Sequence, residues 1–321
     1  MNVYGEQTNI TVDTVFPTVN FSTGSDANNS FLPVPRIKIN VSSTELNPDR
    51  LNVSLKNGTN LAASFNVSYN ASPNWNSFNF TGLADDKYNV SAVLTDLAGN
   101  RNSTLTNLTV TIDTTFPTIA LNNSYDVNGS FVARNYITLN LTVVELYLQN
   151  LTVALKNGTN TASTQNITGN STPAWNLINF TSLADDKYNI TVTAEDKAGN
   201  RNATFPNISI TVDTTAAIVS LISPSHNAFE NPTFTLSYFV NDTSGISSCK
   251  VVSEVLGTIN NGTVLNVSNN NANNQYNEST VKAGDQVVWR VDCTDIVGNT
   301  ASSETRAFTI SQTLPSGTGD G

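Results

Sequence analysis

Short runs of alternating apolar and polar residues cover most of the chain. Clear examples are Ile37–Val41, Leu51–Leu55 and Tyr88–Leu94, in which every second side chain is apolar. Successive side chains of a β-strand point to opposite faces, so this period of two predicts strands with one buried face. Turn residues follow at intervals of about 8–12 residues, which is typical of a β-sandwich with seven or so strands.

Turn chemistry supports the predicted strand ends. Residues 56–59 read Lys-Asn-Gly-Thr between two alternating runs. Asn-Gly favours a tight hairpin because both residues tolerate positive φ. Residues 96–100, Asp-Leu-Ala-Gly-Asn, close the turn after the Tyr88 run. Tyr88 and Tyr188 begin that strand in two parts of the chain, and this position predicts a tyrosine corner, in which the hydroxyl bonds to nearby backbone.

The chain repeats itself with a period of 100 residues. Asp-Thr-Val-Phe-Pro begins at Asp13, Asp-Thr-Thr-Phe-Pro at Asp113, and a third Asp-Thr-Thr at Asp213. Proline fixes φ and lacks an N–H donor, so Phe-Pro predicts a joint at which the chain leaves one sheet before it enters the next. The third joint reads Thr-Ala-Ala and lacks the proline. We therefore expect two similar joints and a third with its own geometry.

This period divides the chain into three domains. We expect an all-β chain of three tandem antiparallel β-sandwiches in an extended array. The predicted units are 1–13, the last strand of a truncated preceding repeat; 14–113, repeat 1; 114–213, repeat 2; 214–312, domain 3; and 313–321, a flexible tail. Repeats 1 and 2 align without a gap and are about half identical. Domain 3 keeps the frame but inserts an Asn-rich segment at 266–277, which we expect to be a loop.

The charge and hydropathy of the sequence limit the classes of partner that the chain can bind. The net charge is −10, and the lysines and arginines are scattered, which disfavours nucleic acid and anionic membranes as partners. The sequence contains no long apolar run and no signal peptide, so we expect no membrane insertion in this stretch.

Asparagine dominates the polar positions. The chain has 48 asparagines, and about half of them open an Asn-x-Ser/Thr sequon. This excess predicts an exported, extracellular glycoprotein, although Asn and Thr chosen for solvent faces of strands would also create sequons by accident. The glycosylation candidates are Asn40, Asn52, Asn57, Asn79, Asn89, Asn140, Asn150, Asn157, Asn179 and Asn189.

The turn, strand and joint motifs resemble the Ig-like repeats of bacterial and archaeal cell-surface proteins. The resemblance is carried by Leu-Ala-Asp-Asp-Lys-Tyr at 83–88, Asp-Leu-Ala-Gly-Asn at 96–100 and the Asp-Thr-Thr-Phe-Pro joint, and it covers nearly all of residues 8–311. It identifies the type of domain and does not specify a function. Domain 3 is similar to Cys-bearing Ig-like domains of archaeal surface proteins, which together with the sequons implies an archaeal source.

Two cysteines lie in domain 3, 44 residues apart. Cys293 shares the inward face of its strand with Trp289, and an exported protein favours a Cys249–Cys293 disulfide. Two free buried thiols are the alternative. A metal site at the cysteines is disfavoured because His226 is the only histidine.

The Asp-x-x-Gly-Asn turns allow two interpretations. The carboxylates of Asp96, Asp196 and Asp295 would accept turn N–H groups. Alternatively, Asp85, Asp96, Asn100 and Asp113 would supply hard oxygen ligands for calcium at a domain junction. The turn interpretation is favoured because the chain has no Asp-x-Asp-x-Asp loop. We therefore assign no cofactor and no metal ligand.

No catalytic residue is assigned either. The chain has no Gly-x-Ser-x-Gly, His-Glu-x-x-His or phosphate-loop motif, and Trp75 and Trp175 fit sandwich packing better than a sugar platform. We expect a non-catalytic stalk that spaces distal domains from the cell envelope, with neighbouring Ig-like domains of a longer chain as partners. The alternatives are an adhesin whose third domain binds a cell-surface protein or glycan, and an accessory region of a larger surface enzyme.

Overall fold

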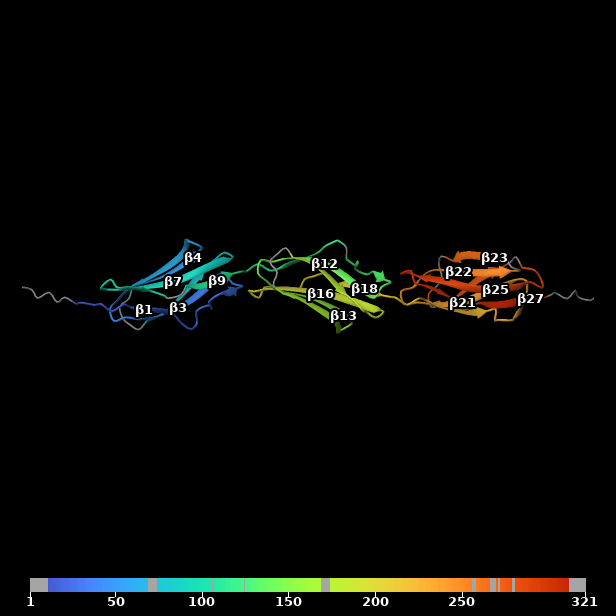
Figure 1. The fold of residues 1–321 in the computed structure, drawn as a ribbon, viewed down its shortest axis with the longest axis horizontal. Helices are drawn as coiled ribbons and strands as arrows, with labels where there is room; N and C mark the ends of the chain where they lie inside the picture. The colour runs from blue at the N-terminus through green and yellow to red at the C-terminus, as the bar shows by residue number, and fades with distance from the viewer. Residues whose placement is uncertain are drawn as a thin grey trace, which may run out of the picture.

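The computed structural model places three β-sandwiches end to end in an extended row (Figure 1). It describes residues 11–68, 74–104, 107–123, 125–168, 174–255, 258–265, 270, 272–278 and 281–311. The expected strand at 1–10 and the expected tail at 312–321 lie outside the described residues. Within the described residues no helix is long and apolar enough to cross a membrane.

Each sandwich packs a three-stranded sheet against a six-stranded sheet. In the first sandwich the small sheet has the order β1 (Thr18–Phe21), β3 (Arg36–Thr44), β6 (Asn74–Thr81). The large sheet has the order β2 (Ser30–Leu32), β9 (Leu108–Ile112), β7 (Asp86–Asp96), β4 (Pro48–Asn57), β5 (Asn60–Ser68), with β8 (Arg101–Ser103) paired to β7. All pairs are antiparallel except β2 with β9, which is parallel.

The second sandwich repeats this topology. Its small sheet is β10 (Thr118–Leu121), β12 (Ile137–Val144), β15 (Ala174–Phe180). Its large sheet is β11 (Phe131–Val132), β18 (Ile208–Val212), β16 (Asp186–Asp196), β13 (Leu148–Asn157), β14 (Asn160–Thr168), with β17 (Arg201–Asn202) on β16.

The third sandwich keeps the same strand order. Its small sheet is β19 (Ile218–Ser223), β21 (Phe234–Asn241), β24 (Ala272–Glu278). Its large sheet is β20 (Phe229–Glu230), β27 (Arg306–Ile310), β25 (Gln286–Asp295), β22 (Ile246–Val255), β23 (Thr258–Leu265), with β26 (Thr300–Ser302) on β25. The predicted all-β, tandem Ig-like fold is confirmed.

The alternation in the sequence becomes the alternation of burial. In β4, Leu51, Val53 and Leu55 are fully buried, whereas Asn52 and Ser54 between them are half-buried on the outer face. Each sandwich has a separate apolar core formed by such residues from both sheets. Neighbouring sandwiches therefore do not share a core, so local contacts at the joints must hold them in line.

The tyrosine corners form as expected in the first two sandwiches. The Tyr88 hydroxyl donates to the Ala84 carbonyl oxygen at 3.1 Å, and the Tyr188 hydroxyl to that of Ala184 at 3.0 Å. Burial raises the pKa of both phenols, with the nearby aspartates adding to the rise. Val287 takes this place in the third sandwich and is fully buried.

Cys249 and Cys293 form a disulfide between neighbouring strands of one sheet. They are directly opposite each other in β22 and β25, with Cα atoms 4.0 Å apart. The bridge therefore lies within a sheet and does not join the two sheets. The matching pair is Leu51 with Leu94 in the first sandwich, so the disulfide replaces an apolar cross-strand contact.

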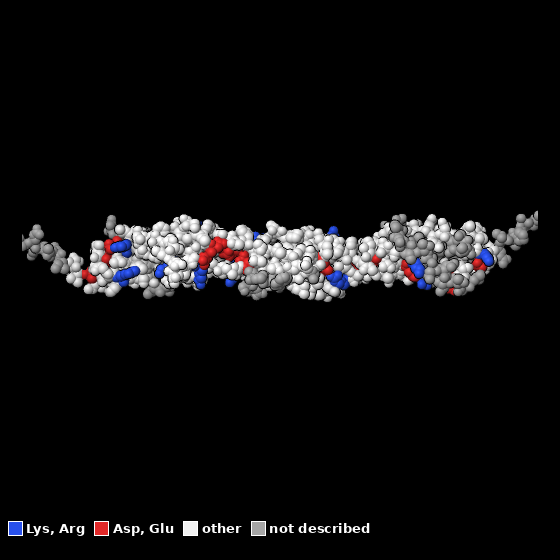
Figure 2. Space-filling view, turned by 90° about the horizontal axis from the view of Figure 1, so that it is seen from above, with Lys and Arg blue, Asp and Glu red and all other residues white. Residues whose placement is uncertain are grey.

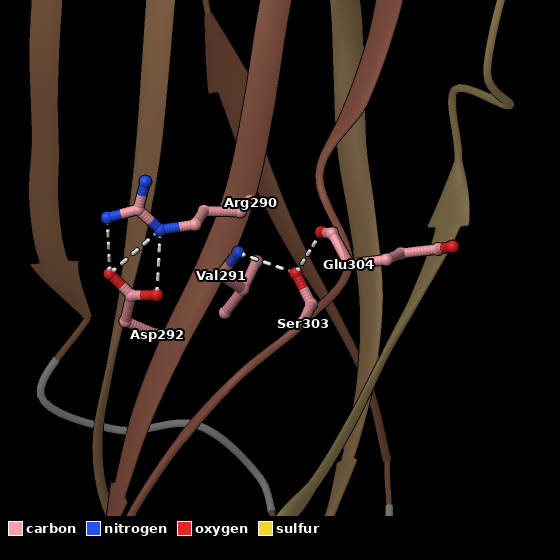
Figure 3. A network of polar contacts seen from close by, with 5 residues as sticks. All are labelled: Arg290, Val291, Asp292, Ser303 and Glu304. Carbon is pink, nitrogen blue, oxygen red and sulfur yellow. Dashed lines mark hydrogen bonds and ion pairs between the residues drawn. The ribbon is translucent and has the colours of Figure 1, made fainter.

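Polar contacts also reinforce the outer side of the third sandwich (Figure 3). Arg290 pairs with Asp292 two residues along β25, which holds the pKa of the arginine above its usual value. The Ser303 hydroxyl accepts from the Val291 N–H at 2.9 Å and donates to the Glu304 carbonyl oxygen at 2.7 Å. The Ser303 contacts fix the chain directly after β26 against β25.

Candidate cation sites at the domain joints

At each joint, one asparagine from the domain that follows donates its side-chain N–H groups to backbone carbonyl oxygens of the joint, a contact that we call the asparagine grip. Asn200 Nδ2 donates to the carbonyl oxygens of Asp113 (2.8 Å) and Thr115 (3.3 Å). Asn100 grips Asp13 and Val15 in the same way. These asparagines end the Asp-x-x-Gly-Asn turns, so the turn motif is also the device that attaches each domain to its joint.

Three carboxylates meet beside each of these grips. The groups are Asp13, Glu45, Asp96; Asp113, Glu145, Asp196; and Asp213, Asp242, Asp295. In each group, one oxygen of every residue lies within 4.8 Å of the others. Carboxylate oxygens are the ligands that Ca²⁺ prefers, and like charges at this range repel unless a cation or protons neutralise them.

The joint between the first two sandwiches shows how the fold builds such a group. Asp113 directly follows β9, the last strand of the first sandwich. Glu145 directly follows β12, and Asp196 ends β16, both in the second sandwich. A cation bound by all three would therefore tie the end of one domain to the near end of the next.

Asp196 is held in place by its own turn. Its Oδ1 accepts from the Asn200 N–H at 2.9 Å, and its Oδ2 accepts from Asn200 Nδ2 at 2.7 Å. Glu145 is similarly fixed because its Oε1 accepts from the Tyr147 N–H at 3.0 Å. Both carboxylates are buried, so they are pre-oriented for a ligand.

Asp113 carries the strongest indication of a missing partner. The residue is 4% exposed, and its Oδ2 is buried without a hydrogen-bond partner. Burial, together with Glu145, Asp196 and Asp85, raises its pKa to about 6. Asp213 Oδ2 at the next joint is also buried and unpartnered, in a residue that is 1% exposed. A buried charge in this state is costly unless it coordinates a metal or is paired.

Acidic residues also gather on the surface around this joint, where Figure 2 shows a red area near the border of the first two sandwiches. A surface hollow of about 400 Å³ is lined there by Asp85, Asp86, Asp113 and Glu145, among others. Asp85 Oδ1 accepts from Thr114 Oγ1 at 2.8 Å and its Oδ2 from Thr115 Oγ1 at 2.7 Å. Asp85 thus fastens the joint from the first domain, opposite the Asn200 grip.

The structure corrects the ligand set expected for calcium. Asp85, Asp96, Asn100 and Asp113 do not come together, so that grouping is wrong. Asp85 directly precedes β7 and Asp96 is its last residue, so the eleven residues of this strand separate the two aspartates by about 36 Å. Asp96 and Asn100 lie with Asp13 at one joint, and Asp85 and Asp113 lie near Glu145 at the next.

The glutamates are the residues that sequence reasoning missed. Glu45 and Glu145 recur at the 100-residue period, in a chain with only eight glutamates. The recurrence of a rare acidic residue at the same position of two repeats is the signal that the sequence offers. It was hidden because each glutamate directly follows an alternating strand and reads as a polar turn residue.

The sequons occupy varied environments. Asn79 and Asn179 are exposed on β6 and β15, which are outer strands of the small sheets. Asn57 Nδ2 instead donates to Asp86 Oδ2 at 2.8 Å, and Asn157 Nδ2 donates to Asp186 Oδ2 at 2.7 Å. Half-buried positions are occupied by Asn40, Asn52, Asn89, Asn140, Asn150 and Asn189. Glycosylation itself stays a prediction.

One family model matches the second unit. Residues 130–214 match the family described as bacterial Ig-like domain. This stretch includes Asp-Lys-Ala-Gly-Asn at 196–200 and ends at the third joint, so it contains both the turn and the asparagine grip. No curated protein sequence matches the chain.

Several solved structures are similar to the chain. One is described as a tetra-tandem repeat in the extending region of a large adhesion protein, with 16% identity, 92% of this chain and 74% of that chain covered, and a TM-score of 0.38. Another is a Ca²⁺-stabilised adhesin with which an Antarctic bacterium binds ice, with 18% identity, 94% and 75% covered, and a TM-score of 0.37. A third contains fibronectin(III)-like modules of CbhA from Clostridium thermocellum, with 20% identity, 60% and 93% covered, and a TM-score of 0.27.

Proposed function

We propose that the chain is a non-catalytic stalk of an exported, N-glycosylated cell-surface protein, in which calcium at the joints holds Ig-like sandwiches in line. The observation that carries the proposal is the repetition of one joint: an asparagine grip and three clustered carboxylates recur at each of the three positions. A device copied at every joint serves the alignment of the array.

The clustered carboxylates suit joints whose stiffness depends reversibly on a bound cation. Without a cation, the carboxylates repel one another across the border between domains. With Ca²⁺, which takes six to eight oxygens at about 2.3–2.6 Å, carboxylates and waters complete the shell. The stalk is thus rigid where calcium is plentiful, as outside cells, and its joints loosen when calcium is removed.

Small-angle scattering of the whole chain tests this proposal. Strands of about ten residues imply sandwiches of about 30 Å, so three in line span on the order of 100 Å. We expect this maximum dimension with CaCl₂ and a shorter, broader distribution with a chelator. Asn200→Ala, which removes one grip, should shorten it even with calcium, whereas the exposed control Asn135→Ala should not. A compact particle in calcium would exclude a stalk, and calorimetry without heat on adding CaCl₂ would exclude the cation.

An adhesin remains the second candidate because the third sandwich differs from the others. It alone has the disulfide, and its β24 presents Asn273, Gln275 and Asn277 to solvent. These side chains are a surface on which a protein or glycan partner would bind. The expected loop at 266–277 is wrong for its last part, because 272–277 belong to β24, which pairs with β21. Deleting 266–277 is therefore not a usable test. The alanine variant of the three exposed residues is the test, and unchanged cell attachment would count against this function.

A further inference from the structure

The third carboxylate group, Asp213 with Asp242 and Asp295, is connected to the Asn-rich segment through Asn270. Asn270 Oδ1 accepts from the Asp242 N–H at 2.8 Å, and Asn270 Nδ2 donates to the Asp242 carbonyl oxygen at 2.7 Å. One side-chain amide therefore pairs with both backbone groups of a single residue. The two residues are 28 positions apart, so this contact bridges the end of β21 and the start of β24.

Asp242 is at the same time a member of the third carboxylate group. It lies beside Asp213 and Asp295, and all three are at most 9% exposed. Asp242 Oδ1 is occupied, because it accepts from the Ser244 N–H, the Ser244 hydroxyl and the Gly245 N–H at 2.8–3.1 Å. Among the described residues no donor to its Oδ2 is seen, which leaves this oxygen to a cation together with the unpartnered Asp213 Oδ2.

This arrangement differs from that of the first two sandwiches. Asp242 directly follows β21, as Glu45 and Glu145 directly follow β3 and β12. Aspartate is one methylene shorter than glutamate, so its backbone must be placed more accurately for the carboxylate to reach the same point. The pairing with Asn270 provides that placement.

We propose that Asn270 is a positioning residue for the third cation site, and that calcium bound there orders the start of β24. The proposal rests on calcium binding at the joints. Calcium drawn to Asp242 fixes its backbone, and the backbone holds Asn270 through two hydrogen bonds. The third joint then couples alignment of the stalk to presentation of the segment that distinguishes the third sandwich.

Two measurements on the full chain test the link. The first is titration with CaCl₂ of a chain that carries Asp96→Asn and Asp196→Asn, so that the third site dominates. Loss of a hydrogen-bond partner of a metal ligand lowers affinity by about 10- to 100-fold, so Asn270→Ala should weaken binding about tenfold. Asn273→Ala, at an exposed asparagine of β24 three positions further along the chain, is the matched control and should bind like the parent.

The second measurement is hydrogen exchange of residues 272–278 with and without CaCl₂. We expect calcium to slow exchange there in the parent and in Asn273→Ala, but not in Asn270→Ala. Asp242→Asn keeps an oxygen for the turn and the backbone pairing with Asn270, so its calcium-free exchange should match the parent while the calcium effect is lost. This variant keeps the test decisive if Asn270→Ala fails to fold.

The outcomes separate the two proposals. Calcium that binds with parent affinity in Asn270→Ala, or that leaves exchange of 272–278 unchanged in the parent, overturns the link while the stalk proposal stands. Calcium protection of 272–278 that persists in Asp242→Asn overturns it as well. Absence of binding at every site of the unmodified chain removes the cation from both proposals.

Discussion

At the scale of the residue, the important feature is that buried acids collect where domains meet. Interior carboxylates are rare unless they are paired or coordinate a metal. The charged groups that shift the pKa of Asp113 are all acidic, namely Glu145, Asp196 and Asp85, and none is a lysine or arginine. A structural turn role explains Asp196 fully, since both of its oxygens accept hydrogen bonds from Asn200. It does not explain the unpartnered oxygen of Asp113.

Asp113→Asn should therefore act in opposite directions with and without calcium. In chelator, removal of one of three clustered charges should raise the free energy of unfolding by about 1 kcal/mol, because repulsion falls. In CaCl₂, the variant should lose the stabilisation that calcium gives the parent at this joint. Calorimetric melting of both proteins measures this, with the surface variant Asp49→Asn as control. Destabilisation in chelator would contradict the repulsion argument.

Tyr188→Phe tests the tyrosine corner. The variant keeps the buried ring and removes the bond to the Ala184 carbonyl oxygen, so it should cost the second sandwich about 1 kcal/mol. Tyr136→Phe, at an exposed tyrosine of the same sandwich, should cost much less. Urea unfolding measures the difference, and equal costs would mean that the corner bond adds nothing.

At the scale of the element, strands β22 and β25 show that the same strand arrangement accepts different buried side chains at one cross-strand position. The position held by Leu51 and Leu94 in the first sandwich holds Leu151 and Ala194 in the second and the disulfide in the third. All of these residues are buried. The third core lacks the tyrosine corner, and the covalent link between its central strands supplies cohesion in another way.

Cys249→Leu with Cys293→Ala copies the pair of the second sandwich into the third. The variant should fold, because the apolar contact is one that this frame already accepts. It should lose stability of up to about 4 kcal/mol, the chain-entropy value for closing a loop of this length. Urea unfolding of the oxidised parent and the variant measures the loss, and the reduced parent is the control. A variant as stable as the oxidised parent would contradict the prediction.

At the scale of the whole molecule, the joints share a plan but differ in strength. Between the first two sandwiches, Phe31 packs edge-on against Tyr147 with centroids 5.0 Å apart, and Lys197 Nζ lies 5.5 Å from the Phe31 ring centroid. At the next joint, Gly245 and Ile296 hold the places of Tyr147 and Lys197. Asn202 Nδ2 also grips the Pro117 carbonyl oxygen at 2.8 Å, and Ala301 holds the matching place in the third sandwich.

The joint at 213–217 should therefore bend more readily than the joint at 113–117. Distance distributions between spin labels on neighbouring sandwiches should be broader across the second of these joints. Tyr147→Gly should broaden the first toward the second, whereas Tyr136→Gly, away from the joint contacts, should leave it unchanged. Equal widths in the parent chain would contradict this ranking.

The sequence by itself determined the number of repeats, the strands and the turns. Strand burial follows a period of two and positive-φ glycines mark the turns, so local chemistry sufficed for Leu51–Leu55 and for Gly58, whose φ is 57°. The pairing of the cysteines could be expected, because two inward residues in one small core have few other partners. The cross-strand position of the disulfide could not, because it depends on the register of β22 with β25.

Only the tertiary structure decided which acids meet. Strands carry the chain from one end of a sandwich to the other, so Asp85 and Asp96, eleven positions apart, lie at opposite joints. Asp113 and Asp196, 83 positions apart, meet beside Glu145 because β9 of one domain and β12 and β16 of the next all end at this joint. The spacing of motifs along the chain reveals the repeats. The acids that form a site are set instead by which strand ends meet at the same joint.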